Sequence, residues 1–419
     1  MKQTKVIKSS LRSPRLVLVV PAFPKLSETF IVNKFLSLLE RGWDVHLVCS
    51  HSDPKDWKAF PQLNGHPDIR SRVHLTWPQS PRWLAGLLVI PALLRGFALS
   101  PHTAFNYLSK GFKQFGWDIF RHFYLDLELI CLQPDIIHFE FGSIAVGRMH
   151  LKQLLECKIS VSFRGYDLNF VGLDQPDYYN EAWKKADACH FLGEDLRQRA
   201  QRRGCPPEMP HMLIPPAVDL DKFPTIERSS NEVIGTREKP LKILSVGRLE
   251  WKKGYEFALS AMKILQDQGL VVEYRIVGEG EHRVAVEFAC HQLGIKENVQ
   301  FLGALPHEQV IEQLVWTDVF LHSAVSEGFC NAVIEAQAMG LPVVTSDADG
   351  LGENVADGVT GFVVPRRDPK ALAEKIALLA NSPEVRKSFG LAGKKRVRSL
   401  FTLERQLDAF ESFFQKLSA

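Results

Sequence analysis

The sequence predicts an α/β protein made of two doubly wound halves, each a parallel sheet covered by helices on both faces. In the first half, short apolar runs typical of buried strands alternate with helical patterns. A second series of the same kind begins at Leu241, and the stretch between the two, residues 225–240, is polar and carries no periodicity. We therefore expect a first domain of residues 12–224, a linker over 225–240 and a second domain of residues 241–402.

The first half opens with a βα unit. Arg15–Val20 has the composition of a buried strand, and Ser27 is placed to cap a helix over Glu28–Arg41. Phe30, Ile31, Phe35, Leu38 and Leu39 form one apolar stripe along that helix. The further strands that we expect in this half are Asp44–Cys49, Ile136–Phe139, Ile159–Phe163 and Ala188–Leu192.

The second half repeats the pattern with short β-branched runs. Continuous apolar runs of this length are typical of parallel strands that are buried on both faces. The expected strands are Ile243–Val246, Glu273–Val277, Val299–Leu302, Val319–His322, Pro342–Thr345 and Gly361–Val364, with helices over Glu256–Gln268 and Ala371–Ala380.

Composition narrows the class of protein and the compartment. The chain has 419 residues and a net charge of +3, which is too small to indicate nucleic-acid binding. Its seven cysteines form no CxxC pair, which argues against a zinc site or a disulfide framework and favours a reducing compartment. The basic N-terminus lacks the pattern of a signal peptide, and no run of about 18 uncharged apolar residues is present. We expect a cytoplasmic protein without a transmembrane helix.

The most informative stretch runs from Ser326 to Pro365. It places Glu327 and Glu335 eight residues apart, the first in a loop and the second on an expected helix over Ala332–Met339. We expect Asn331 to cap that helix, whose unpaired N–H groups favour a phosphate. Carboxylates in these places can accept hydrogen bonds from the hydroxyls of a ribose or of a sugar.

A cation pair precedes this stretch in the chain. Arg248 ends the apolar run at Val246-Gly247, and Lys253 follows five residues later. A guanidinium fork and a lysine ammonium both suit a leaving diphosphate. Taken singly, each of these residues is better explained as surface charge on an ordinary βα unit. The whole ordered set instead favours a site for a nucleotide diphosphate sugar.

This ordered set resembles the C-terminal, donor-binding half of family 4 retaining glycosyltransferases, which have the GT-B fold. The resemblance implies two Rossmann-like domains facing across a cleft, with a last helix over 403–419 that crosses back onto the first domain. It implies that the first domain binds the acceptor and the second binds the donor. It also implies catalytic roles for Arg248, Lys253 and Glu327, and donor-binding roles for Gly247, Gly278, Gly328, Phe329, Asn331 and Glu335.

The resemblance also bears on metals and cofactors. Asp347-Ala348-Asp349 has the form of a DxD metal motif, but it lies in a loop that leads into Gly350-Leu351-Gly352. Members of this family generally work without a metal, so we expect neither a metal nor any other cofactor.

The first half resembles the same family, with departures. Pro24–Phe30 (PKLSETF) is similar to a loop of exopolysaccharide glycosyltransferases such as those for colanic acid, which places Ser27 and Glu28 on the acceptor side. Glu140 stands where relatives have a histidine beside the transferred sugar, and Arg164 likewise replaces a histidine, with Asp167 close behind it. Because a lone buried charge is costly, a Glu140–Arg164 ion pair is more plausible than two independent changes. We expect Glu140 to be catalytic and Arg164 and Asp167 to lie on the acceptor side.

Residues 69–117 form an unusual segment. They contain no Asp or Glu but six Arg and Lys residues, interleaved with aromatic residues around the apolar run Leu84–Leu94. Two interpretations stay open. The segment could lean on an anionic bilayer as a peripheral membrane contact, or it could be a helix buried in the first domain with solvated arginines.

The function that these features predict is transfer of a hexose, with retention, from a nucleotide diphosphate sugar to a saccharide or lipid-linked acceptor in polysaccharide biosynthesis. This would take place in the cytoplasm, at the inner face of the plasma membrane if the acceptor is carried on lipid. One alternative is a catalytically degenerate protein that only binds the nucleotide sugar, and another is a 2-epimerase. A dinucleotide oxidoreductase is disfavoured, because no GxGxxG follows the first strand.

Overall fold

A computed structural model describes residues 13–25, 28–65, 68–224, 226 and 232–418. The chain divides into two compact units, and each is described by itself. Unit 1 comprises Met1–Phe191, Ala200–Met212 and Leu407–Ala419, and unit 2 comprises Leu192–Arg199 and Leu213–Gln406.

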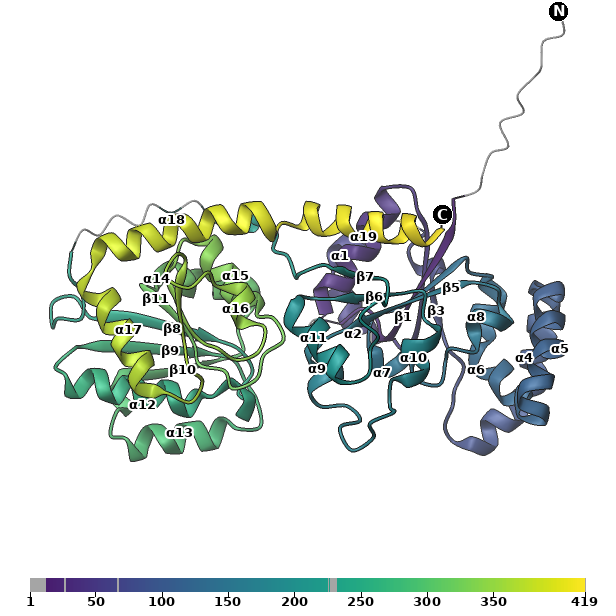
Figure 1. The fold of residues 1–419 in the computed structure, drawn as a ribbon, viewed down its shortest axis with the longest axis horizontal. Helices are drawn as coiled ribbons and strands as arrows, with labels where there is room; N and C mark the ends of the chain where they lie inside the picture. Colours follow the sequence, from purple (N-terminus) through teal and green to yellow (C-terminus); the bar gives the residue numbers. More distant parts are fainter. Residues whose placement is uncertain (1–12, 26–27, 66–67, 225, 227–231, 419) are drawn as a thin grey trace, which may run out of the picture. The chain divides into compact units, whose positions relative to one another are not determined.

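Unit 1 is built on a seven-stranded sheet with the order β3-β2-β1-β4-β5-β6-β7 (Figure 1). Pairing from β3 through to β6 is parallel, with Leu18 opposite both Leu47 and His138. The strand order reverses between β1 and β4. The strands are β1 (Arg15–Ala22), β2 (Asp44–His51), β3 (Val73–Leu75), β4 (Ile136–Phe139), β5 (Lys158–Phe163), β6 (Ala188–Phe191) and β7 (His211–Leu213).

The helices of unit 1 differ in how far they are buried. Helix α1 turns Ile31, Val32 and Phe35 into the core, whereas α4 and α5 lie beyond α6, away from the sheet (Figure 1). In chain order the helices are α1 (Thr29–Glu40), α2 (Pro54–Lys58), α3 (Pro61–Asn64), α4 (Arg82–Leu99), α5 (Pro101–Phe115), α6 (Ile119–Leu132), α7 (Gly142–Ala145), α8 (Leu151–Leu154), α9 (Gly165–Asn169) and α10 (Asn180–Lys185); α11 (Glu194–Arg202) has residues in both units.

Unit 2 has a six-stranded parallel sheet with the order β10-β9-β8-β11-β12-β13, which reverses between β8 and β11. Its strands are β8 (Leu241–Val246), β9 (Val272–Val277), β10 (Val299–Gly303), β11 (Val319–His322), β12 (Val343–Ser346) and β13 (Gly361–Val364). Its helices are α12 (Tyr255–Asp267), α13 (Arg283–Gln292), α14 (His307–Trp316), α15 (Asn331–Ala338), α16 (Leu351–Asn354), α17 (Pro369–Asn381) and α18 (Pro383–Leu400).

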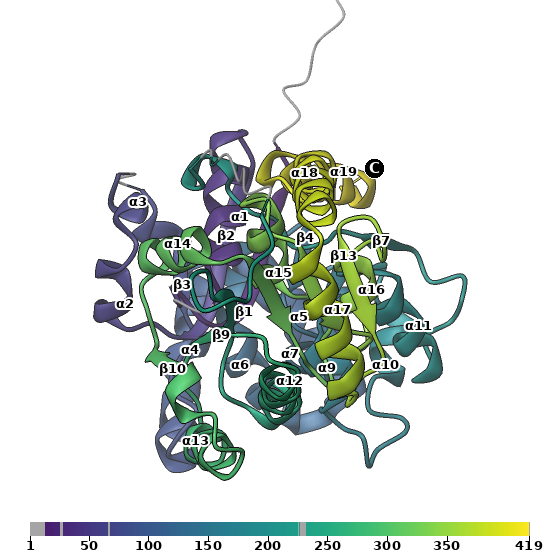
Figure 2. The same cartoon turned by 90° about the vertical axis from the view of Figure 1, so that its left-hand side faces the viewer.

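Two apolar clusters cover the two faces of this sheet. One contains Ala258, Leu259 and Met262 of α12 with Leu372 and Ile376 of α17, and these two helices lie side by side in Figure 2. The other gathers α14 and α15 over the opposite face. The predicted class, an α/β protein with two doubly wound parallel sheets, is therefore confirmed.

The boundary between the units differs from the predicted one. The division falls at Met212 and Leu213, earlier than the predicted 224. The described part of the predicted linker belongs to unit 2, because Ile234 is buried in its core and Gly235 pairs through its backbone with Lys239 and Val271.

The last helix is α19 (Leu403–Ser418), which follows α18 closely. Its residues from Leu407 onward group with unit 1, in agreement with the helix that the resemblance implied. There Phe410 and Phe414 pack edge-on against His138 of β4.

Candidate functional site

In unit 2 the predicted donor residues follow β8 and β11, the two strands between which the sheet order reverses. Ligands of doubly wound sheets bind at the carboxyl ends of the strands at such a point. Gly278, just after β9, has a φ of +144°, and a Cβ there would lie 2.0 Å from the carbonyl oxygen of Gly247. Only glycine allows the loops after β8 and β9 to approach this closely.

Lys253 and Glu327 form an ion pair, although they are 74 residues apart in the chain. Nε2 of His322, the last residue of β11, lies 3.4 Å from Oε2 of the same glutamate. Burial works against ionisation of Glu327, but Lys253 and His322 outweigh it and lower its pKa to about 2. Burial lowers the pKa of His322, but the interactions with Cys330 and Glu327 outweigh this effect and raise that pKa to about 9. The Glu327 carboxylate therefore lies between the Lys253 ammonium and the His322 imidazole.

Asp349 holds the loop that carries Glu327. Its Oδ2 accepts hydrogen bonds from the Ser326 hydroxyl (2.7 Å) and the Glu327 N–H (3.1 Å). Its Oδ1 pairs with Arg366, which also binds Asp347. Both carboxylates of the DxD-like sequence are thus engaged by protein groups.

Helix α15 begins at Asn331, with Cys330 in the N-cap position, so the prediction of Asn331 as the cap was off by one residue. Asn354 supports this start, since it accepts from the Cys330 N–H and donates to the Cys330 carbonyl. Asn331 itself is exposed in the first turn.

The remaining predicted donor residues occupy different surroundings. Arg248 is 70% exposed and pairs with Glu250 at 2.7 Å. Glu335 is partly exposed on α15, with Oε1 3.4 Å from His307 Nε2. Gly328 is buried, and Phe329 packs edge-on against Phe401 in an apolar cluster. Phe329 therefore anchors the loop by packing against this cluster as a partly buried side chain.

In unit 1 the described acceptor-side residues follow the neighbouring strands β1, β4 and β5. Glu140 directly follows β4 and is fully buried, with Lys34 Nζ at 2.8 Å from Oε1 and Arg164 Nη2 at 3.2 Å from Oε2. The expected Glu140–Arg164 ion pair is therefore present, and Lys34 completes it. Burial opposes ionisation of Glu140, but Lys34, His138 and Arg164 lower its pKa to about 2.

Arg164 is the member of this cluster that reaches the surface. Its side chain is 15% exposed, and its guanidinium lies 3.9 Å above the ring of Phe30. Glu140, by contrast, is enclosed and contacts Lys34 and Arg164. The catalytic role that was expected for Glu140 stays a prediction.

The other predicted acceptor-side residues are Glu28, Asp167 and Ser27. Glu28 pairs with Lys25 at 2.9 Å, and its Oε2 is enclosed without a hydrogen-bond partner among the described residues. Asp167 is fully buried and accepts from the N–H groups of Ser143 and Arg164, so it ties the start of α9 to α7. Ser27 lies outside the described residues.

Two members of these clusters, Lys34 and His322, were missed from the sequence. Lys34 lies three or four residues from Phe30, Ile31 and Leu38, on the apolar stripe of α1. A lone charge on such a stripe predicts a buried partner. His322 ends a predicted strand, and only the fold brings it close to Glu327.

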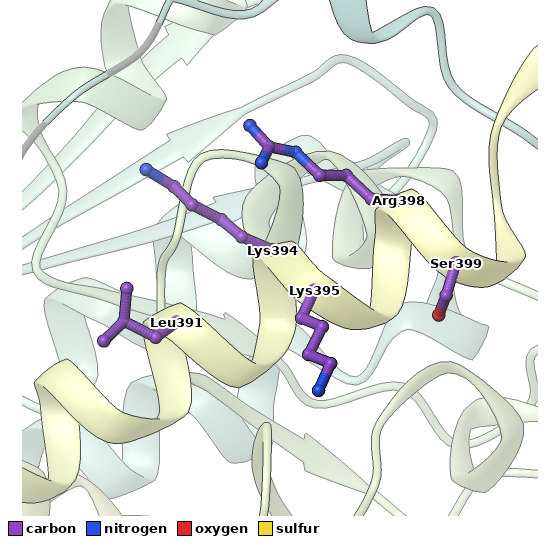
Figure 3. A pocket seen from close by; sticks show the side chains of 5 residues that line it. All are labelled: Leu391, Lys394, Lys395, Arg398 and Ser399. Atoms are coloured by element: carbon purple, nitrogen blue, oxygen red, sulfur yellow. The ribbon is translucent and has the colours of Figure 1, made fainter.

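A hollow of about 440 Å³ lies elsewhere in unit 2, along α18. It is lined by Leu391, Lys394, Lys395, Arg398 and Ser399 (Figure 3). None of these residues belongs to either cluster, so this hollow does not mark the predicted site.

Comparison with known proteins assigns most of the second half of the chain to a protein family. Residues 227–396 match the model of the family described as glycosyl transferases group 1. These residues are a group 1 glycosyl transferase domain. This glycosyl transferase domain contains every predicted donor residue, from Gly247 to Glu335.

The similarity to known glycosyltransferases extends beyond this domain to most of the chain. It is 28% identical over 384 residues to a protein of Salmonella typhimurium named as the colanic acid biosynthesis glycosyltransferase WcaL, covering 85% of this chain and 88% of that one. It is 24% identical over 409 residues to the amylovoran biosynthesis glycosyltransferase AmsK of Erwinia amylovora, covering 90% and 94%. The resemblance stated from the sequence is thus confirmed.

Among solved structures, Anabaena HepE in complex with UDP and glucose is similar with a TM-score of 0.69 at 15% identity, covering 96% of this chain and 100% of that one. The fold of this glycosyltransferase is therefore GT-B.

Proposed function

We propose that this protein is a retaining hexosyltransferase of exopolysaccharide biosynthesis that uses a nucleotide diphosphate sugar as donor. The observation that carries the proposal is the Lys253–Glu327–His322 cluster, which places the positive charges of Lys253 and His322 where the order of the sheet reverses. A diphosphate is the ligand class that such a charge favours. The names of WcaL and AmsK support the pathway, and the UDP and glucose bound by HepE support the ligand class.

In the proposed reaction, the bond between the anomeric carbon and the diphosphate oxygen breaks as an acceptor oxygen bonds to the same face of that carbon. The acceptor proton passes to the departing phosphate. Lys253 and Arg248 stabilise the negative charge that develops on the diphosphate, and each such contact is worth about 2–4 kcal/mol. Glu327 binds sugar hydroxyls, and Glu335 binds the ribose diol.

We propose further that the reaction needs no metal. Glu327, His322 and Cys330 offer three potential ligand atoms within 4.8 Å of one another. Lys253, however, already pairs with this carboxylate, so a divalent ion would have to displace the lysine to bind there. Transfer should therefore persist in excess EDTA.

The compartment that we propose is the cytoplasm, at the inner face of the plasma membrane. All seven cysteines are free, as is usual in a reducing compartment. A lipid-linked acceptor would keep the substrate at that membrane.

The direct test is to incubate the protein with UDP, GDP and ADP sugars and a lipid extract, and to follow release of the nucleoside diphosphate. The configuration of the new glycosidic bond is then read by NMR. Transfer with retention is expected. Donor binding without transfer or hydrolysis would support the alternative, a catalytically degenerate binding protein.

A further inference from the structure

Unit 1 carries an exposed apolar surface on the pair of helices α4 and α5. Trp83, Leu87, Ile90 and Leu94 recur at intervals of four, three and four residues, which places them on one face of α4. Each is 66–68% exposed, and soluble proteins rarely expose a contiguous stripe of this kind. Helix α5 adds two exposed rings seven residues apart. We call Trp83, Leu87, Ile90, Leu94, Phe105 and Phe112 the α4–α5 surface.

The opposite face of each helix is firmly seated in unit 1. Ala92 and Gly96 of α4 are buried, and a Cβ at Gly96 would lie 2.5 Å from the ring of Phe123 on α6. From α5, the buried Tyr107 hydroxyl donates to Asp126 at 2.6 Å. The interpretation of this segment as a helix buried in the first domain is therefore wrong for α4, of which only one narrow face is covered.

The charged side chains that α4 and α5 themselves carry are all basic. Residues 69–117 contain no Asp or Glu. Arg95 pairs with Glu128 and Lys110 with Glu156. Arg82 and Lys113 are exposed, and no acidic group among the described residues pairs with them. The surface thus offers apolar side chains next to two basic residues, Arg82 and Lys113, that no described acidic group neutralises.

We propose that the α4–α5 surface lies in the headgroup region of an anionic phospholipid bilayer, as a peripheral membrane contact. Apolar insertion combined with basic residues is the pattern of helices that lie in the plane of a membrane interface. The inference rests on the proposed function in one respect, since binding there would hold the enzyme beside a lipid-linked acceptor.

Two other occupants fit less well. Among the described helices, α4 is the one long and apolar enough to cross a membrane by length and composition. Its attachment to α6, however, would have to break for it to span, exposing Phe123. A second copy of the chain would bring together two surfaces that both lack acidic residues.

Cosedimentation with vesicles tests the proposal. The whole protein is mixed with vesicles of phosphatidylcholine alone, or of phosphatidylcholine with phosphatidylglycerol. Binding should be stronger to the mixed vesicles and should weaken with salt. The double variant Leu87→Glu/Ile90→Glu should bind at least about tenfold more weakly. Arg82→Gln/Lys113→Gln should lose about fivefold per charge on the anionic vesicles only.

The matched control is Val284→Glu/Phe288→Glu on α13, where both side chains are also well exposed (77% and 60%). It should bind vesicles like the wild type. Circular dichroism checks that each variant folds.

The proposal is overturned if the wild type binds no vesicles or if Leu87→Glu/Ile90→Glu binds equally well. It is also overturned if only detergent extracts the protein from membranes, because this indicates that α4 spans the bilayer. A third result against it is a wild-type dimer that Leu87→Glu/Ile90→Glu dissociates. Thermal stabilisation by nucleotide sugars is measured on the same samples. Donor binding without vesicle binding refutes only this inference, whereas vesicle binding without donor binding refutes the proposed function.

Discussion

The Lys34 ammonium lies 2.8 Å from Oε1 of Glu140, and neither side chain is more than 2% exposed. Arg164 approaches the other oxygen of the same carboxylate. Unit 2 repeats this arrangement, with Glu327 between Lys253 and His322. Each unit therefore has one carboxylate between two cationic groups at the place where its strand order reverses.

Removing Lys34 should lower the stability of the fold, because the buried Glu140 carboxylate then keeps Arg164 as its one remaining arginine or lysine partner among the described residues. Lys34→Met should lower the free energy of unfolding by about 3–5 kcal/mol, measured by urea denaturation. Lys34→Met combined with Glu140→Met should recover most of the loss. The control Lys25→Met removes a half-exposed partner of Glu28 and should cost less than about 1 kcal/mol. If Lys34→Met left the free energy of unfolding unchanged, the result would contradict the ion pair with Glu140.

Arg164 should matter for transfer and not for donor binding. Arg164→Lys keeps the charge but loses the planar fork that contacts both the Glu140 carboxylate and its carbonyl. We expect kcat to fall by about 10²-fold, while stabilisation by the donor stays at the wild-type level. Equal losses in donor binding and turnover would show that Arg164 acts through the fold.

Lys253 should be needed for turnover. Lys253→Ala removes the cation that we assign to the leaving diphosphate, so kcat should fall by about 10²–10³-fold with the fold retained. The neighbouring variant Lys252→Ala, whose ammonium pairs with Glu250, serves as the matched control and should keep most of the activity. Wild-type turnover in Lys253→Ala would refute the diphosphate role.

His322 should make stability depend on pH. Its pKa rises from 6.5 to about 9 in the folded protein, because Cys330 and Glu327 outweigh the effect of burial. A raised pKa means that the charged form stabilises the fold, fully below pH 6.5 and progressively less as pH rises to 9. The difference in unfolding free energy between wild type and His322→Gln should therefore shrink by about 3 kcal/mol between pH 6 and pH 9.5. Urea denaturation across this range measures it, and a constant difference would refute a charged His322.

Much of the fold was predictable because each unit repeats short buried strands. The bounds of β4, β11 and β13 were predicted to the residue, since they are continuous apolar runs between polar loops. Helix α18 was not predicted, because its sequence is polar and contains two glycines. Gly390 is explained only by the fold, where a Cβ would lie 2.3 Å from the Gly340 carbonyl oxygen.

The donor cluster was predictable as a set of residue types, whereas its pairing was not. Glu327 and Lys253 were expected to bind different parts of the donor, yet in the structure they bind each other. The pairing of Lys34 with Glu140, which lie 106 positions apart, was not predicted either. Contacts over such separations depend on how the helices cover the sheet, which local patterns do not encode.

The measurement that tests the central claim most directly is thermal stabilisation by UDP, GDP and ADP and their sugars, in wild type and in Glu335→Ala. A ligand at about 100 times its Kd should stabilise the protein by about 2.7 kcal/mol. We predict a shift with one nucleotide that Glu335→Ala abolishes, while Glu308→Ala, at an exposed glutamate on α14, retains it. No shift with any nucleotide, or a shift unchanged in Glu335→Ala, would contradict the assignment of a donor site to unit 2.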